Sequence, residues 1–572
     1  MFKMGVAGIF SGLLLWGTVA QASLESNLLH TPEADALAVI ETQASSWDFM
    51  LQREPFASAM TEFREDIAGD ISEELGLDLD AEILPILGSH LSLAFYAGDS
   101  IPVLMAMDLK PGASAQAYAR LVQRFQQKAK ADPKKKLKQI KIGAYTLYGF
   151  QRTDRKQDPV YMTRTENTLL LGGRERLQAA LEQQHTRSIL KKPEFQSVYA
   201  RLKQHKLWFY ADPAGVSQAL QMQKLDPDQW KATFNPYDSL GLGIDINPQG
   251  VLMRTVSQLK KTGLSAAQQT QVNALLKSWS TPSQTPQLQR KITPAQVLLF
   301  GQGTHLKNLW QMAQVFPTID RESLAFQNQL KEGFKAFTGL DFERDILQPS
   351  DGNLSVAVFY PPGIDVFDRP PQMVLSIGAQ NAARLRQNIT QKLTLDVAAL
   401  GAPSSSRQRK KNPPLRFFEK PTTRYSGVPL FTARPNKTAQ RLEQAFFVEP
   451  VLGQVGDLWL LASSMDAMKL SIDQWKNKAP TLNGNRYLSQ LQQIHQLDPQ
   501  MGTLFLDLRS LGAMLEYLAG EDEEIETLKP TMNAFRSVLV GAKHQDRVLE
   551  TVAIVDILWE DVDFKVIQRV MR

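Results

Sequence analysis

The amino-acid sequence predicts an α+β fold in two tandem copies, each a mixed helix and antiparallel-sheet domain, related by a pseudo-twofold axis. Residues 76–96 (GLDLDAEILPILGSHLSLAFY) closely resemble residues 339–359 (GLDFERDILQPSDGNLSVAVF). Short runs rich in aromatic and β-branched residues, typical of strands, alternate with amphipathic helical patterns. Most of these runs come as neighbouring pairs joined by short turns, which favours antiparallel pairing.

The similarity between the two halves extends over most of the chain. Thr31-Pro32 is repeated as Thr293-Pro294, and further pairs of segments match in the same order. These pairs are 101–107 with 370–376, 143–150 with 427–434, 167–173 with 457–463, 206–212 with 502–508, and 240–256 with 538–555. Insertions fall between the matched segments, where surface loops tolerate them, so the pattern indicates a duplicated fold.

Individual elements follow from local periodicity. Strands are expected at 91–96, 143–150 and 206–212, which are short and rich in aromatic and branched residues. Helices are expected at 114–131 and 381–395, because apolar residues recur there at three- and four-residue spacings. The residues expected to face the core are Ala117, Tyr118, Leu121, Val122 and Phe125 in the first helix and Leu385, Ile389 and Leu393 in the second.

The N-terminal residues have the layout of a signal peptide. Lys3 precedes an apolar run from Val6 to Val19, and Ala20-Gln21-Ala22 offers a small-residue cleavage pattern. The apolar run is shorter than the roughly 20 residues that a membrane-spanning helix needs. We therefore expect residues 1–22 to be removed and the mature protein to be periplasmic or extracellular, in the cell envelope. An uncleaved anchor, touching the membrane only through this segment, is the alternative.

The rest of the chain divides into a first repeat at 23–276, a linker at 277–291 and a second repeat at 292–572. Serine, threonine, proline and glutamine dominate the segment 277–291 (KSWSTPSQTPQLQRK), which is typical of a connection between domains. Both a hinge and an ordered connector fit this composition.

Composition excludes several classes of function. The net charge of +5 is small for 572 residues, so no nucleic-acid partner is expected. The absence of cysteine excludes a thiolate nucleophile, disulfides, an iron–sulfur cluster and the lipid attachment of a lipoprotein. No two histidines are three or four residues apart, so no helix presents a two-histidine metal site. The sequence assigns no catalytic residue, no cofactor and no metal ligand.

One pattern of a serine enzyme is present. Ser188-Ile189-Leu190-Lys191 fits S-x-x-K and Lys261-Thr262-Gly263 fits K-T-G, in the order used by penicillin-recognising enzymes. However, no S-x-N or Y-x-N lies between them, and the second pattern follows a strand-like run and is typical of a turn. We therefore expect that the protein is not an enzyme. The alternative is a serine acyl-transfer enzyme whose site contains Ser188 and Lys191.

Acidic residues in the repeated motif allow two interpretations. They are Asp78 and Asp80 in the first copy and Asp341, Glu343 and Asp345 in the second. A calcium loop would need a central glycine and a terminal glutamate that are missing here. We prefer a polar start to a short helix, because acidic side chains are favourable at the positive end of the helix dipole.

Two basic stretches occupy corresponding places. Segments 131–141 (ADPKKKLKQIK) and 404–416 (SSSRQRKKNPPLR) each follow a long amphipathic helix and precede a strand, so we expect two basic loops. Their cations form a hypothetical contact with an anionic partner: Lys134, Lys135, Lys136, Lys138, Arg407, Arg409, Lys410 and Lys411. The two segments do not align in sequence, yet both are strongly basic, which favours an anionic ligand. Solvated loops have the same composition and are the alternative.

The motif G-L-D-(L/F)-x-x-(D/E)-I-L, followed by the strand LS(L/V)A(F/V), resembles a family of exported bacterial proteins catalogued as domain of unknown function 3352. The second copy departs from the family's Pro-x-Leu-Gly ending at Gln348–Gly352. The resemblance implies export and an α+β fold, and it implies no catalytic or binding residue.

The preferred function is a non-enzymatic envelope protein that binds or scaffolds an unknown protein partner or an anionic envelope component. A carrier of an apolar ligand is an alternative, suggested by the aromatic strand residues Tyr96, Tyr145, Trp208 and Phe209.

Overall fold

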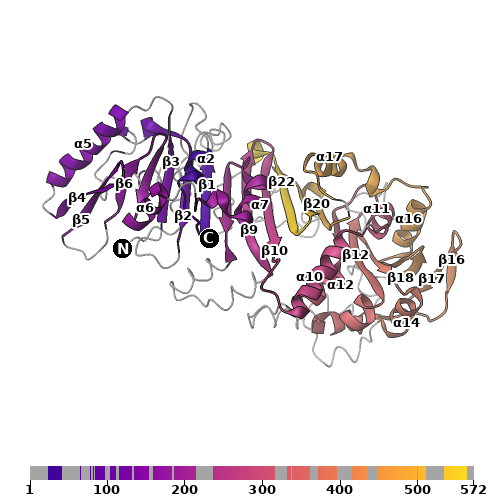
Figure 1. Cartoon of the computed structure of the whole chain (residues 1–572). Coiled ribbons are helices and arrows are strands. Elements are labelled where there is room, and N and C mark those ends of the chain that lie inside the picture. The colour runs from indigo at the N-terminus through magenta and orange to yellow at the C-terminus, as the bar shows by residue number, and fades with distance from the viewer. Residues whose placement is uncertain are drawn as a thin grey trace, which may run out of the picture. The chain divides into compact units, whose positions relative to one another are not determined.

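Figure 1 shows the structure of the chain, a computed structural model. It describes residues 24–41, 65, 78, 81–82, 84–96, 103–110, 115–131, 134–153, 159–182, 186–213, 236–281, 283–315, 331–336, 338–360, 371–395, 415–433, 449–498, 500–510 and 534–562. The expected signal peptide at 1–22 and the cations Arg407, Arg409, Lys410 and Lys411 lie outside the described residues. The chain divides into two compact units between Lys260 and Lys261.

The first unit combines helices with an antiparallel sheet. Its strands are β1 (Ala36–Glu41), β2 (Leu87–Phe95), β3 (Val103–Leu109), β4 (Lys135–Ile142), β5 (Tyr145–Arg152), β6 (Tyr161–Arg164), β7 (Thr168–Gly172), β8 (Leu207–Ala211), β9 (Tyr237–Asn247) and β10 (Gly250–Leu259). Its helices are α2 (Leu24–Leu29), η2 (Leu84–Ile86), α5 (Ala115–Ala131), α6 (Arg174–Glu182), η3 (Ile189–Lys191) and α7 (Pro193–Leu202).

The strands of the first unit pair in the order β4-β5-β6-β7-β3-β2-β1-β8-β9-β10, and each of these pairs is antiparallel. The strands expected at 91–96, 143–150 and 206–212 are β2, β5 and β8. The prediction of a mixed helix and antiparallel-sheet fold is therefore confirmed.

The second unit has the same kinds of element. Its strands are β11 (Leu299–Gly303), β12 (Ser350–Phe359), β13 (Gln372–Ala379), β14 (Thr394–Leu395), β15 (Leu415–Arg416), β16 (Thr423–Tyr425), β17 (Val428–Thr432), β18 (Val451–Val455), β19 (Leu458–Ala462), β20 (Thr503–Asp507), β21 (Phe535–Gln545) and β22 (Val548–Ile557). Its helices are α10 (Ala266–Trp279), α11 (Thr285–Lys291), α12 (Leu306–Val315), η4 (Phe342–Leu347), α14 (Ala382–Lys392), α16 (Met465–Trp475), η7 (Leu482–Gly484), α17 (Arg486–Ile494) and η8 (Trp559–Asp561).

The sheet of the second unit pairs in the order β16-β17-β18-β19-β13-β12-β11-β20-β21-β22, again antiparallel throughout. Strands β14 and β15 form a separate pair. Position by position along the chain, this is the pairing order of the first unit.

The long helix of each unit supplies apolar residues to its core. Leu121, Val122 and Phe125 of α5 are buried in a cluster with residues of β1, β2 and β3. In the second unit, Leu385 and Ile389 of α14 are buried in a cluster that also contains residues of η4, β17 and β19. The helical faces expected from the apolar spacing are therefore confirmed at these residues. No helix in the described ranges is long and apolar enough to cross a membrane.

The segment 277–291, expected to be a linker, contains helical residues of the second unit. The described residues of this segment belong to the second unit, since α10 ends at Trp279 and α11 spans Thr285–Lys291. Gln289 and Arg290 of α11 are buried, with 0% and 5% of their surface exposed. The polar composition indicated an exposed connection, but the fold buries these side chains and supplies part of their hydrogen-bond partners: Gln302 bonds to both, and Gln492 and Thr503 accept from Arg290.

Candidate functional site

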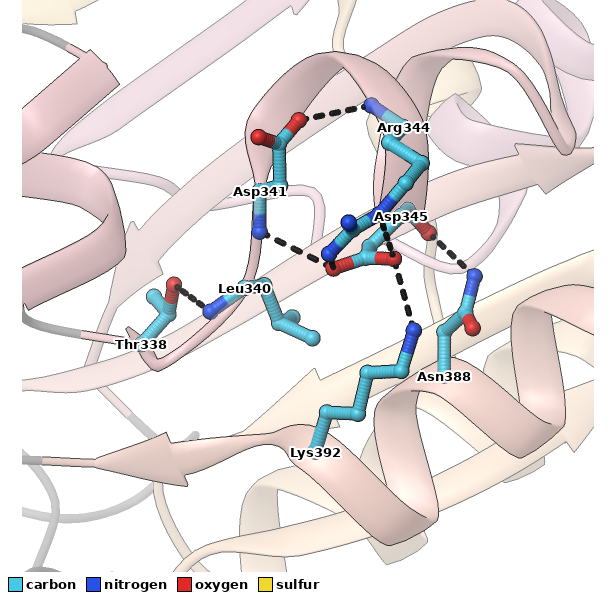
Figure 2. Close-up of polar contacts among 7 residues, drawn as sticks. All are labelled: Thr338, Leu340, Asp341, Arg344, Asp345, Asn388 and Lys392. Carbon is cyan, nitrogen blue, oxygen red and sulfur yellow. Dashed lines mark hydrogen bonds and ion pairs between the residues drawn. The ribbon is translucent and has the colours of Figure 1, made fainter.

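The repeated acidic motif forms a helix cap in the second unit. Gly339 has a φ of 69°, in the left-handed region that glycine favours. Asp341 Oδ1 accepts a hydrogen bond from the Arg344 amide at 2.8 Å, and Asp345 Oδ2 accepts one from the Asp341 amide at 3.0 Å (Figure 2). Each carboxylate thus satisfies a backbone amide that has no helical partner at the start of η4, as in a capping box.

The Asp345 carboxylate also joins the motif to α14. It is 2% exposed and accepts hydrogen bonds from Arg344 Nε at 3.1 Å and Lys392 Nζ at 2.9 Å, while Asn388 Nδ2 donates to the Asp345 carbonyl (Figure 2). Burial alone would raise the pKa of Asp345, but the hydrogen bonds from Arg344, Lys392 and the Asp341 amide hold it well below its usual range. The carboxylate is therefore ionised and internally satisfied.

The first unit repeats this arrangement with a longer acidic side chain. Asp78 Oδ1 accepts from the Ala81 amide at 2.8 Å, and Glu82 Oε2 accepts from the Asp78 amide at 2.9 Å. Arg124 of α5 lies 3.3 Å from Glu82 and takes the place of Lys392 of α14. In the second unit the motif caps a short helix and ties it to the long helix that follows, and the expectation of a polar helix start is confirmed there. In the first unit the same pair of backbone contacts is present, while Asp80 lies outside the described residues.

Ser188 is positioned as a structural residue. The residue is 1% exposed, and its hydroxyl donates to the Leu28 carbonyl at 2.7 Å and accepts from the Leu190 amide at 3.3 Å, which caps η3. Among the described residues, the Lys191 amino group makes no hydrogen bond to this hydroxyl. The geometry therefore corrects the alternative of an acyl-transfer enzyme, because the hydroxyl is neither exposed nor next to a base.

We expect Ser188→Ala to lower the free energy of unfolding of the first unit by about 1–2 kcal/mol, because the buried Leu28 carbonyl loses its donor. Lys191→Ala, at an exposed position, should change it by less than about 0.5 kcal/mol. Urea unfolding of the chain measures both. Covalent labelling of the wild type by a fluorescent penicillin, absent from Ser188→Ala, would contradict the structural role.

The aromatic strand residues contribute to packing. Trp208 is fully buried, with its ring centroid 6.0 Å from that of Phe195 on α7. Tyr96 is 2% exposed and donates a hydrogen bond to the Pro32 carbonyl at 3.2 Å, and Phe209 packs against the core cluster under α5. Tyr145 is half-buried at the start of β5. Core packing accounts for the first three of these residues without an apolar ligand.

The first basic stretch is a strand and not a loop. Residues 135–142 form β4, in which Lys136 lies opposite Gln151 of β5 and Lys138 lies opposite Gly149. Leu137 packs against the core cluster, so the alternation in KLKQIKI is that of a half-buried strand. Of the four predicted lysines, only Lys134 precedes the strand, and the expectation of a loop is corrected.

Helix α5 and the β4–β5 hairpin form what we call the basic edge, residues 115–153. This segment contains ten lysines and arginines and one acidic residue, a net +9 against +5 for the whole chain. Within the described part of the first unit, β4 pairs with β5 alone, and α5 lies beside it (Figure 1). Among the side chains of this segment that the structure describes, the exposed cations are Arg120, Arg124, Lys130, Lys134, Lys136 and Lys141.

Part of this charge has no ion-pair partner among the described residues. Among the described residues, Lys136, Lys138 and Lys141 make no ion pair, whereas Arg124 pairs with Glu82. Arg120, Arg124 and Lys130 lie outside the single loop expected at 131–141, so the charge of that segment alone does not reveal them. Lys141 ends that segment but was not among the expected contacts. The net charge of the helix and the hairpin taken together includes all four.

The comparisons with known proteins identify the family. Residues 31–555 match the family model described as "Protein of unknown function (DUF3352)", and the chain belongs to this family. Solved structures that match are entitled "Structure of crystal form III of TP0453" and "Structure of crystal form I of TP0453". Each is 10% identical over 45% of this chain, with 89% and 87% of the other chain covered and TM-scores of 0.23 and 0.24. No curated protein matched the chain.

Proposed function

We propose that the protein is an exported, non-enzymatic binding protein of the cell envelope that docks on an anionic lipid surface through the basic edge. The observation that carries the proposal is the concentration of a net +9 in residues 115–153 of a chain whose total is +5. The remainder of the chain is net negative, so the positive potential belongs to this part of the first unit.

The magnitude of the charge is sufficient for docking. A lysine or arginine close to an anionic membrane contributes about 1 kcal/mol, and the contributions fall off within a Debye length of about 10 Å at 0.1 M salt. Several exposed cations on one helix and hairpin can therefore act together at one surface. Lysines on an outer strand also prevent pairing with other chains, so the association state must be measured alongside binding.

The test is co-sedimentation of the mature chain with vesicles of phosphatidylcholine and phosphatidylglycerol. We expect salt-sensitive binding, and about a tenfold or greater loss of the partition coefficient when four lysines are replaced by glutamine. The four are Lys134, Lys136, Lys138 and Lys141. The matched control neutralises four exposed lysines of the second unit, Lys277, Lys335, Lys420 and Lys478, for the same change in net charge.

Three outcomes would contradict the proposal: no binding by the wild type, equal losses in the two variants, or a monomeric wild type whose basic-edge variant aggregates. In the last case, the lysines protect the outer strand from pairing.

We infer in addition that the two units arose by tandem duplication. The repeated motif, the common pairing order and the equivalent helix caps support this inference. The second basic stretch then belongs to the counterpart of the basic edge. Neutralising Arg407, Arg409, Lys410 and Lys411 as well should lower vesicle binding further than the four lysines alone, and no further loss would contradict a matched pair of contacts.

A further inference from the structure

The second unit contains a buried arginine with neutral partners. Arg290 of α11 is 5% exposed. Its Nε donates to Gln302 Oε1 at 3.3 Å, its Nη1 to Gln492 Oε1 at 3.1 Å and its Nη2 to Thr503 Oγ1 at 2.7 Å. Among the described residues, no carboxylate lies within ion-pair distance of the guanidinium.

The guanidinium remains charged in this position. Burial lowers the pKa of Arg290 to about 10, while the negative charge of Asp498 opposes the shift. The side chain is thus a cation at neutral pH. A buried charge without an opposite charge is unfavourable, so an anion bound next to this cation would stabilise it.

Hydrogen-bond donors remain unused around this cation. A guanidinium has five N–H groups, and the described residues engage three of those of Arg290. Arg290 can only donate, so the Oε1 of Gln492 must face it. The Nε2 of Gln492 and the Nε2 of Gln289 are then both buried without a partner among the described residues. The place is therefore rich in donors and lacks an acceptor.

A pocket opens beside these donors. Its volume is about 340 Å³, and its lining includes both Arg290 and Gln492. Gln287, Asn483 and Ser489 contribute further polar groups, and two leucines complete the wall. This size is at the lower end of the range for small-molecule sites, which suits a small polar ligand.

The corresponding place in the first unit is apolar. The offset of 262 that superposes Thr31-Pro32 on Thr293-Pro294 places Leu28 at the position of Arg290. Pro32 and Pro294 form equivalent isolated bridges, to Ser188 and Thr481. In the strands, Gln302 pairs with Ser355, and the matching Ser92 of the repeated motif pairs with Val39, so Val39 occupies the position of Gln302. Leu28 and Val39 are both buried. The first unit thus fills this place with apolar side chains, so packing alone does not require a charged residue in the second unit.

We propose that this pocket binds a small oxyanion, a carboxylate or phosphate group, in a fork formed by the free N–H groups of Arg290 with the Gln492 amide as an additional donor. Planar guanidinium groups bind these anions through two parallel hydrogen bonds, which gives geometric selectivity over chloride. This site uses no residue of the basic edge and is independent of vesicle docking.

The test measures binding of inorganic phosphate and of acetate to the full mature chain by calorimetry and thermal unfolding, against sodium chloride at equal ionic strength. We expect stabilisation by one or both oxyanions and none by chloride, and the preferred probe identifies the group. Arg290→Met should weaken binding by about tenfold or more. Arg486→Met, at an exposed position on α17 outside the pocket lining, removes the same charge and should change affinity by less than about twofold.

A second variant keeps the test decisive if Arg290→Met does not fold. Ser489 is exposed and lines the pocket, so Ser489→Phe should obstruct the pocket without removing a hydrogen bond of Arg290. We expect it to abolish oxyanion binding with an unchanged melting temperature. Oxyanions that stabilise the wild type no more than chloride does, or undiminished binding in Ser489→Phe, would overturn the proposal. The basic-edge variant should bind these anions as the wild type does, which separates the two proposals.

Discussion

We expect Asp345→Ala to lower the free energy of unfolding of the second unit by about 3 kcal/mol. The variant loses a cap on the Asp341 amide and the hydrogen bonds from Arg344 and Lys392 to a carboxylate that is 2% exposed. The loss is limited because the two cations are themselves 63% and 44% exposed and regain water. Urea unfolding, with hydrogen exchange to assign each transition to its unit, measures the change.

The matched control is Glu82→Ala in the first unit. Glu82 makes the equivalent cap, but its side chain is 20% exposed and its partner Arg124 is 65% exposed. Hydrogen bonds and ion pairs that water already screens contribute less, so we expect a loss of about 1 kcal/mol. Equal losses at the two sites would show that burial does not set the strength of the cap.

The Asp345 effect should depend on pH in one direction. The pKa of this carboxyl is depressed in the folded state below its unfolded value of about 3.9. Its contribution is therefore complete above the unfolded pKa and is lost as the pH falls through the folded pKa. The difference between wild type and Asp345→Ala should be constant from about pH 5 to 7 and should shrink below about pH 4. A difference that grows in acid would contradict this assignment.

Trp208→Ala is expected to destabilise the first unit by about 4 kcal/mol. The indole is fully buried on β8, and its ring centroid lies 6.0 Å from the rings of both Phe195 and Tyr199 on α7. Helix α7 and strand β9 are already in close contact, because a β-carbon added to Gly241 of β9 would lie 2.4 Å from Val198 of α7. The helix therefore cannot easily move into the space that the indole leaves. The variant therefore leaves a cavity.

The conservative control is Trp208→Phe. The indole N–H of Trp208 is buried without a hydrogen-bond partner in the described part of the chain, so phenylalanine removes an unsatisfied donor and keeps most of the apolar contact. We expect a loss below about 1.5 kcal/mol, measured by the same urea unfolding. If phenylalanine is as damaging as alanine, the indole has a polar role and the packing argument is wrong.

Local periodicity was sufficient to predict the main elements. Leu121, Val122 and Phe125 recur at helical spacing, and α5 buries all three. The strand at 206–212 is β8, because an aromatic run of this length suits a sheet. Periodicity failed for β4, since its lysines masked the alternation that Leu137 and its neighbours carry. Whether such a segment is a strand depends on its partner β5, which a charge count does not reveal.

By itself, the sequence determined the kinds of element, their order and the recurrence of the motif, because helix and strand geometry impose short periods that one chain segment displays. Only the tertiary structure decided which polar side chains are buried. Arg290 belongs to a segment with the composition of a linker, yet it is bonded to Gln492, which is 202 positions away. Burial depends on partners that are remote in sequence, so no local pattern of charge or hydropathy could separate this arginine from the solvated cations of the basic edge.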